Sequence, residues 1–361
     1  MDIDLDAQHF ATQQRFVERV NKLTGGKKAY VFIDEIQRIE NAGLFLKGLY
    51  DRRLPYKWLA TGSGSLELKE KISESLAGRK RNFFLYPVSI FEFAAFRLNT
   101  QISQIPGLLS TDAVTEEQIL LQYLCYGGYP KVITSTDEQE KWEVLVEIFQ
   151  SYIERDIQVL LKIEKSQALI VLLQLLAHRI GRLINYQDLA QMTNLSVATV
   201  KHYIWYLQNT FIVEELTPFF TNKEKELVKT PQYYFVDPGL RNYLLNTRVV
   251  TVLSPDFGFL FQQLIFYILQ ALVVNTVATL HYWRTQNQAE VDFVLRDGSR
   301  VLPIEVKATT MTKPQVERSL RSFIETYHPE EAWVVNRSLS KTILIENTKV
   351  RFLPWYEIQT L

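Results

Sequence analysis

The sequence predicts an α/β protein of several regions, and three observations lead to that prediction. Between residues 30 and 96, apolar runs of strand length alternate with segments of helical spacing. Residues 100–180 carry mostly helical patterns. From residue 257 onward, a long apolar helix precedes four short strand patterns. At 361 residues the chain exceeds one typical domain, so we expect two or three domains.

The composition limits the classes of partner and the compartment. Lysine plus arginine and aspartate plus glutamate both total 40, so DNA binding would depend on local patches. The single cysteine, Cys125, excludes an internal disulfide framework and fits a reducing compartment. The acidic N-terminus does not resemble a secretory signal, and no apolar run approaches the roughly 18 residues of a membrane helix. We expect a cytoplasmic protein with no membrane partner.

The first predicted strand ends in two acidic residues. Residues 30–33 are all apolar, as in a parallel strand covered on both faces, and Asp34 and Glu35 follow directly. After a segment of helical spacing, a second strand at residues 58–61 ends in a glycine and serine turn that contains Ser63. Because α/β folds gather the ends of parallel strands at one ligand-binding edge, we expect these polar residues to lie together.

This pair of acids is typical of a nucleoside triphosphatase. In that chemistry Asp34 would hold magnesium through water, and Glu35 would polarise the attacking water. Ser63 would sense the γ-phosphate, and Arg79 would reach phosphate as a bidentate cation. The alternatives are a strand that ends in two solvated acids and an arginine on a solvated basic face. Such an enzyme also needs a Gly-Lys-Ser/Thr loop, and Gly25–Lys28 lacks its spacer and its hydroxyl residue.

Residues 185–236 predict two short helices followed by a hairpin, which is the order of a winged helix. Asn185 resembles an N-cap, and a second helix begins near Ser196. Strands at residues 211–215 and 232–236 flank a charged segment. The outward residues of the second helix are Thr199, Lys201, His202 and Tyr206. Their low charge leaves contact with DNA and docking of a protein both open.

A second acidic pattern lies near the C-terminus. One predicted strand carries Asp292, and the next carries Glu305 and Lys307, which resembles the PD-(D/E)xK nuclease core. Residues two apart in a strand face the same side, so Glu305 and Lys307 would join Asp292 around one divalent cation. Asp292 and Glu305 would bind this cation, Mg²⁺ or Mn²⁺. Lys307 would position water or stabilise charge on phosphate. A buried acid and lysine pair is the alternative, and Gln262 stands where such cores commonly carry a glutamate.

Several motifs along the chain resemble one family. They are Phe32–Gln37, Thr61–Ser63, Gly78–Arg79, Leu85–Phe93, Gly127–Pro130, Tyr152–Ile157 and Phe235–Leu240. Together they resemble prokaryotic AAA-type ATPases with a C-terminal domain of unknown function, DUF4143. The resemblance implies ATP with Mg²⁺ as cofactor, a Walker B role for Asp34 and Glu35, and a P-loop upstream. That P-loop segment is missing from this sequence, so we expect weak or absent nucleotide binding.

The expected α/β architecture has four parts. They are a truncated P-loop NTPase sheet of the AAA type at residues 1–98, a helical region at 99–180, a winged helix at 181–245 and a PD-(D/E)xK nuclease-like domain at 246–361. Three functions stay open: an ATP-binding protein, a metal-dependent nuclease or DNA-binding protein, and a non-catalytic interaction protein. Nucleotide is the partner implied by the resemblance, whereas DNA, another protein and a second copy of the chain stay open.

Overall fold

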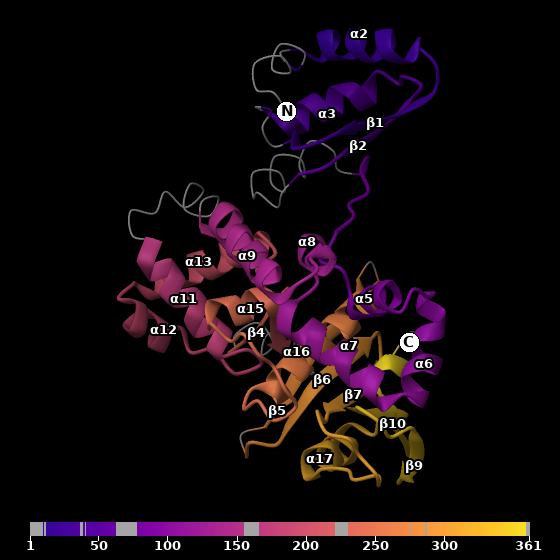
Figure 1. Cartoon of the computed structure of the whole chain (residues 1–361), viewed down its shortest axis with the longest axis vertical. Helices are drawn as coiled ribbons and strands as arrows, with labels where there is room; N and C mark the ends of the chain where they lie inside the picture. Colours follow the sequence, from indigo (N-terminus) through magenta and orange to yellow (C-terminus); the bar gives the residue numbers. More distant parts are fainter. Residues whose placement is uncertain are drawn as a thin grey trace. The chain divides into compact units, whose positions relative to one another are not determined.

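The computed structural model describes residues 10, 12–36, 39, 41–62, 78–154, 166–220, 230–274, 276–285 and 287–358 (Figure 1). The chain divides into two compact units. The first comprises residues 1–85 with 205–211, and the second comprises residues 86–204 with 212–361. Each unit is described below by itself.

The first unit is built on a short parallel strand pair. Its elements are α2 (Gln13–Thr24), β1 (Ala29–Ile33), α3 (Ala42–Asp51) and β2 (Tyr56–Ala60). The strands pair in parallel with Ile33 opposite Ala60, as the sequence predicts for adjacent strands. Thr12 caps α2 through its side chain, and Gly25 ends the helix in the left-handed conformation.

Only one face of this strand pair is covered by the described residues. Ile33 packs into a cluster with Phe16 of α2 and Phe45 of α3. On the other face, Tyr30 and Phe32 are 75% and 72% exposed. The expectation that this strand is covered on both faces is therefore wrong for the described part of the unit, because both of its helices pack on the Ile33 side.

The second unit joins many helices to one large sheet. Its helices are α5 (Ile90–Arg97), η2 (Ile102–Gln104), α6 (Ile105–Thr111), α7 (Ala113–Tyr126), α8 (Pro130–Thr134), α9 (Glu138–Ile148), η3 (Phe149–Glu154), α11 (Ser166–His178), α12 (Tyr186–Thr193), α13 (Val197–Asn209, which extends into the first unit), α15 (Pro238–Leu244), α16 (Phe257–Val273), α17 (Arg318–Tyr327) and η4 (Trp355–Glu357). None of the described helices is long and apolar enough to cross a bilayer.

The sheet has eight strands in the order β4-β3-β5-β6-β7-β8-β10-β9. Their bounds are β3 (Val213–Pro218), β4 (Gln232–Phe235), β5 (Thr279–Arg284), β6 (Glu290–Asp297), β7 (Arg300–Val306), β8 (Glu331–Asn336), β9 (Lys341–Ile345) and β10 (Thr348–Pro354). β5, β6 and β7 form an antiparallel meander, and β7 then pairs in parallel with β8 after the crossover through α17.

Two helices cover the central strands from opposite faces. Phe293 of β6 packs against Phe266 of α16, whereas Val291 and Val294 pack with Phe323 of α17. Figure 1 shows α16 in the middle of this unit, between α7 and the strands. Asp292 of β6 lies at the α16 face of this sandwich.

The expected hairpin is part of the large sheet. β3 and β4 are antiparallel, and β3 also pairs in parallel with β5 at Thr217–His281 and Pro218–Tyr282. The two helices before it form as predicted, since Asn185 accepts hydrogen bonds from the Gln187 and Asp188 amides. The hairpin therefore continues the C-terminal sheet, and residues 221–229 between its strands lie outside the described residues.

The glycine motif at residues 127–128 and the motif that contains Asp237 pack on one another. The Gly128 amide donates to Asp237 Oδ2 at 2.6 Å, and a Cβ at Gly127 would lie 2.0 Å from Asp237 Oδ1. Asp237 also caps α15 by accepting from the Leu240 amide at 3.0 Å. Burial raises the pKa of Asp237 to about 6, although these backbone hydrogen bonds oppose the shift. These contacts give both motifs a structural role.

Candidate functional site

The first acidic pair lies where β1 ends, beside the end of β2. The Thr61 hydroxyl donates to Asp34 Oδ1, and the Thr61 amide donates to the Ile33 carbonyl at 2.9 Å. The Ile36 amide returns a hydrogen bond to the Thr61 carbonyl at 3.0 Å. Asp34 and Thr61 are both exposed. The two strand ends therefore present an acid and a hydroxyl together at one edge.

The turn after Asp34 has an unusual backbone conformation at Glu35. Its φ of 53° is left-handed, which costs free energy for a residue with a side chain. The Glu35 amide donates to Asp34 Oδ1 at 3.1 Å, and the next residue, Ile36, is buried in the core. The turn thus fixes the Asp34 carboxylate from its own backbone while Ile36 anchors the chain.

The other two residues predicted for this site are not brought to Asp34 by the described structure. Ser63 lies outside the described residues. Arg79 forms an ion pair with Asp51 at 3.2 Å. Asp51 is the last residue of α3, which runs from the end of β1 back to the start of β2. Arg79 therefore lies toward the opposite edge of the strand pair.

Thr61 is the residue that the sequence argument missed at this edge. It is the last of the residues predicted for the second strand, and only the structure shows that it follows β2. A hydroxyl residue directly after a strand that neighbours an acidic strand end was the available signal. The choice of Ser63 over Thr61 came from placing the end of β2 one residue too late.

In the second unit, a β-bulge aims Asp292 at α16. Residues of β5 and β6 pair as His281–Val294 and Trp283–Val291, so Asp292 and Phe293 share one opposing residue. Both side chains therefore face α16: Asp292 Oδ1 accepts from Gln262 Nε2 at 2.9 Å, and Asp292 Oδ2 accepts from the Val306 amide at 2.7 Å. Bulges of this kind commonly redirect a side chain next to a functional site.

Glu305 and Lys307 lie together at the end of β7. Lys307 Nζ is 3.1 Å from Glu305 Oε1 and 3.5 Å from Glu317. Glu305 is buried, and its Oε2 atom has no hydrogen-bond partner within the described part of the chain. A buried carboxylate oxygen without a partner is costly, so this atom requires an explanation.

Little positive charge lies near half-buried Asp292 and buried Glu305. Burial raises the pKa of Asp292 well above the usual range of an aspartate, and Glu305 raises it further. Burial also raises the pKa of Glu305, although Lys307 opposes that shift. For Lys307, burial alone would lower the pKa, but Glu305, Glu317 and Asp292 together raise it. One lysine does not balance both carboxylates.

A cavity of about 220 Å³ opens beside Asp292. Its lining residues are Pro255, Gly258, Phe259, Gln262, Asp292, Val306 and Ala308. The cavity therefore lies between the start of α16 and the ends of β6 and β7. It is large enough for a hydrated cation together with one small anionic group.

The donor set beside this cavity fits one divalent cation with an incomplete shell. Asp292 lines the cavity and Glu305 lies on the neighbouring strand, and carboxylates are ligands of the kind that Mg²⁺ and Mn²⁺ take, whereas Gln262 presents its Nε2 atom to Asp292 and its Oε1 atom lies near Gly181. The unpartnered Glu305 Oε2 atom supports this fit. No group of three or more histidine, cysteine, aspartate or glutamate side chains suited to a metal occurs among the described residues. Water would have to complete the coordination.

In the helix for which contact with DNA and docking of a protein both stay open, two of the four residues predicted to face outward are exposed, whereas Thr199 and Tyr206 are half-buried. Its inward residues Val200, Ile204 and Leu207 are buried, and Lys201 and His202 are exposed. Lys201 lies 5.1 Å from the ring centroid of Tyr186, a contact within the protein. The lysines of the hairpin loop, at positions 223, 225 and 229, lie outside the described residues.

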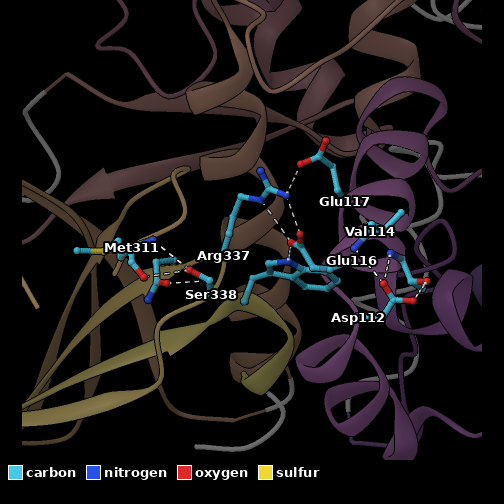
Figure 2. Close-up of polar contacts among 10 residues, drawn as sticks. Asp112, Val114, Glu116, Glu117, Met311, Arg337 and Ser338 are labelled. Carbon is cyan, nitrogen blue, oxygen red and sulfur yellow. Dashed lines mark hydrogen bonds and ion pairs between the residues drawn. The ribbon is translucent and has the colours of Figure 1, made fainter. Parts of the chain in front are cut away.

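A buried ion pair ties α7 to the C-terminal part of the sheet, and no sequence pattern indicated it. Figure 2 shows Arg337 reaching two neighbouring carboxylates, with Nη2 at 2.7 Å from Glu116 and 3.0 Å from Glu117. Trp355 Nε1 donates to Glu116 Oε1 at 2.6 Å. Glu116 and Arg337 are only 4% and 6% exposed. The partners are more than 200 positions apart in sequence, so neither pattern nor spacing reveals them.

Comparisons with known proteins identify the two ends of the chain. Residues 1–94 match the AAA domain family, and residues 257–357 match a domain of unknown function, DUF4143. The chain therefore combines an N-terminal AAA domain with a C-terminal DUF4143 domain, which confirms the resemblance seen in its motifs. Residues 117–250 match a further domain of unknown function, DUF8612, which spans much of the predicted helical region and winged helix.

Similar proteins occur in bacteria and archaea, and each is described only as uncharacterized. One from Mycobacterium tuberculosis is 27% identical over 322 residues, which cover 88% of this chain and 66% of that protein. One from Haemophilus influenzae is 26% identical over 83% of this chain and 70% of its own length. One from Methanocaldococcus jannaschii is 26% identical over 81% and 64%. The chain thus spans about two thirds of the length of these relatives.

Proposed function

We propose that the first unit supplies the metal-facing and water-facing side of a nucleoside triphosphate site. The observation that carries this proposal is the contact between Asp34 and the Thr61 hydroxyl at the shared edge of β1 and β2. Parallel strands of α/β folds bind ligands at this edge. The match of residues 1–94 to an AAA domain supports the same assignment.

Each residue at this edge has a distinct role in the proposal. Asp34 is exposed and would hold magnesium through water, while Thr61 orients its carboxylate. Glu35 would polarise the attacking water from its left-handed turn. Ser63 would face the γ-phosphate. Bound magnesium would neutralise charge on the phosphates.

The residues expected to face the phosphates fit a nucleotide site less well than Asp34 and Thr61 do. The 361-residue sequence contains no Gly-Lys-Ser/Thr loop, and Arg79 is held by Asp51. Backbone amides and a lysine normally cradle the phosphates in such a site. We therefore expect this polypeptide to bind Mg-ATP weakly or not at all.

Calorimetry on two polypeptides tests the proposal. For the 361-residue chain, a saturable Mg-ATP isotherm with micromolar affinity would contradict the expectation of weak or absent nucleotide binding. If the DNA upstream of the Met1 codon encodes an in-frame Gly-Lys-Thr or Gly-Lys-Ser segment, the longer product should bind Mg-ATP. Asp34→Ala should abolish that binding, and Asp51→Ala, an acid at the other edge, should preserve it. Equal binding by both variants would refute a role for Asp34.

A second candidate function is metal-dependent hydrolysis of phosphodiesters in the second unit. The observation that favours it is Asp292 in the cavity wall, with Glu305 on the neighbouring strand carrying a buried oxygen that has no partner among the described residues. The meander, crossover helix and parallel strand support a PD-(D/E)xK-like core. In such a site Asp292 and Glu305 would bind the cation, and Lys307 would hold water or stabilise phosphate.

A cleavage assay separates this candidate from a non-catalytic interaction protein. Wild-type protein is incubated with DNA and Mg²⁺ or Mn²⁺ beside Asp292→Ala and Asp297→Ala. Asp297 is an exposed acid at the end of the same strand, so its variant is a matched control. Cleavage that is lost only in Asp292→Ala supports a nuclease. Absence of cleavage in the wild type, or cleavage equal in all three, would reject it.

A further inference from the structure

The geometry points to Arg182 as a phosphate-binding side chain at the mouth of the Asp292 cavity, which makes the site a composite of two regions. This inference rests on the second proposed function, because it assigns the substrate contact of that same cavity. Arg182 belongs to the region that matches DUF8612, whereas Asp292 belongs to the DUF4143 domain. Neither match alone therefore contains the whole site.

Arg182 is held at the cavity wall by an aromatic ring. Its guanidinium carbon lies 4.5 Å from the ring centroid of Phe259, and Phe259 lines the cavity together with Gln262 and Asp292. Stacking of a guanidinium on an aromatic face leaves its N–H edge available for a planar, bidentate anion. This position, against a residue of the cavity wall, suits contact with a ligand that enters the cavity.

The turn that carries Arg182 approaches the site closely. Gly181 has a left-handed φ of 65°, and a Cβ there would lie 3.0 Å from Gln262 Oε1. The Gly181 amide donates to the Tyr233 carbonyl at 3.2 Å, and the Ile184 amide donates to the Pro231 carbonyl at 2.9 Å. These hydrogen bonds fix the turn against β4. Gln262 also donates a hydrogen bond to Asp292. Arg182 directly follows Gly181, so the turn places it close to the hydrogen-bonded pair of Gln262 and Asp292.

Arg182 forms no ion pair with any residue that the structure describes. Three other arginines of this neighbourhood pair with acids: Arg179 with Asp188, Arg241 with Asp256 and Arg284 with Glu290. Over the ranges that the structure describes, Arg182 has no such ion pair, and it is exposed. A cation without an ion pair, close to a cavity whose wall carries the Asp292 carboxylate, defines a ligand that brings both charges: a divalent cation with a phosphate ester.

A nucleic-acid strand is the phosphate ester that fits an open cavity rather than a closed pocket. A strand can run past Arg182 while one phosphate lies beside Asp292, whereas a mononucleotide would gain only a single contact. The contact with Arg182 would be a charge-assisted, bidentate hydrogen bond to a phosphate oxygen pair. It would therefore strengthen binding without reading sequence.

Fluorescence anisotropy with a labelled single-stranded oligonucleotide in Ca²⁺ tests this inference without requiring cleavage. Arg182→Ala should weaken binding by about tenfold and lower the salt dependence by about one unit, and Arg182→Lys should lie between. Arg300→Ala is the matched control, because Arg300 is an exposed arginine at the far end of β7 and should change affinity little. Equal thermal midpoints would show that the variants are folded.

The outcomes separate this inference from the proposed function. Arg182-dependent binding without any cleavage would support the inference and reject the nuclease. Cleavage at the wild-type rate by Arg182→Ala would retain the nuclease and overturn the inference. Absence of oligonucleotide binding, or equal weakening in Arg182→Ala and Arg300→Ala, would overturn it. If a mononucleotide competes as well as the oligonucleotide, Arg182 contacts a single phosphate group, and the inference of a nucleic-acid ligand is overturned.

Discussion

The chain presents two acidic sites built from the same residue types in opposite environments. In the first unit, Asp34 is exposed at the end of a two-stranded pair and is oriented by Thr61. In the second, half-buried Asp292 contacts Gln262 of α16, and buried Glu305 lies on the neighbouring strand β7 of the eight-stranded sheet. An exposed acid costs little folding free energy, because water solvates its charge. Buried acids need positive charge nearby, and the structure supplies only part of it.

The two sites therefore differ in what their structure indicates about a ligand. At the first, geometry shows which groups share an edge, and binding depends on a phosphate loop. At the second, Glu305 has an oxygen without a partner among the described residues, and burial raises the pKa of both acids, so a cationic ligand is the one to test. The difference between exposed and buried acids therefore generates the following predictions.

Removing the partner of a buried acid should have the largest effect. Arg337→Met leaves Glu116 buried without its cation, so the free energy of unfolding should fall by about 3–5 kcal/mol. Lys131→Met removes an exposed pair, Lys131–Glu147 at 2.6 Å, and should cost about 0–1 kcal/mol. Urea denaturation of both variants measures the difference, and equal losses would contradict the contrast.

The pH dependence of stability should also follow the buried acids. The pKa of Asp237 is about 6 in the folded protein and 3.8 in the unfolded chain, so the folded state binds more protons between these values. Stability is therefore gained as pH falls through 6 and lost as pH rises through 6. Lowering the pH from 7.5 to 5 should add about 1–2 kcal/mol from this group. Asp292 and Glu305 shift in the same direction.

Denaturation of the second unit at several pH values measures this slope. Asp292→Asn should reduce it, because one acid with a raised pKa is removed. A slope of the opposite sign in the wild type would show that these acids are compensated in a way that the structure does not contain.

Much of the fold was predictable because it rests on local patterns. The apolar run of β1, the Asn185 cap and the length of α16 are each encoded within one segment. The joining of β3 to β5 was not predictable, because it depends on a pairing about 60 positions away. Helix α17 and strands β9 and β10 were missed, although the spacing of Leu320, Phe323 and Ile324 in α17 is a clear helical pattern that was available in the sequence.

The candidate sites were predictable as residue types but not as environments. The spacing of Glu305 and Lys307 placed them on one side of a strand, and they lie 3.1 Å apart. The β-bulge that aims Asp292 at Gln262 has no local signature, since it appears only in the pairing of β5 with β6. Arg79 illustrates the limit, because its basic neighbourhood did not reveal the ion pair with Asp51.

Adding a carboxylate should improve metal binding at the buried site. Gln262 already contacts Asp292, so Gln262→Glu would bring a third acid to the cavity. More ligand charge strengthens binding of hard cations, and the Mn²⁺ affinity should rise by about tenfold. Titration of Mn²⁺ by calorimetry measures it. Unchanged or weaker affinity would mean that the cavity does not hold the cation beside Asp292.

The smallest predicted changes in the free energy of unfolding come from replacing one acid at each site by asparagine. Asp292→Asn removes an under-compensated buried charge and should raise the free energy of unfolding by about 1 kcal/mol at pH 7.5. Asp34→Asn changes an exposed acid and should stay within about 0.5 kcal/mol of the wild type. Destabilisation by Asp292→Asn would indicate that its hydrogen bonds outweigh its charge.

Titration of the 361-residue chain with Mn²⁺, compared with Asp292→Asn and Asp34→Asn, tests the contrast between the two acidic sites most directly. The account predicts one cation site in the wild type that is lost in Asp292→Asn and kept in Asp34→Asn. Retention of the site in Asp292→Asn, or its loss in Asp34→Asn, would contradict the assignment of the cation to the buried acids.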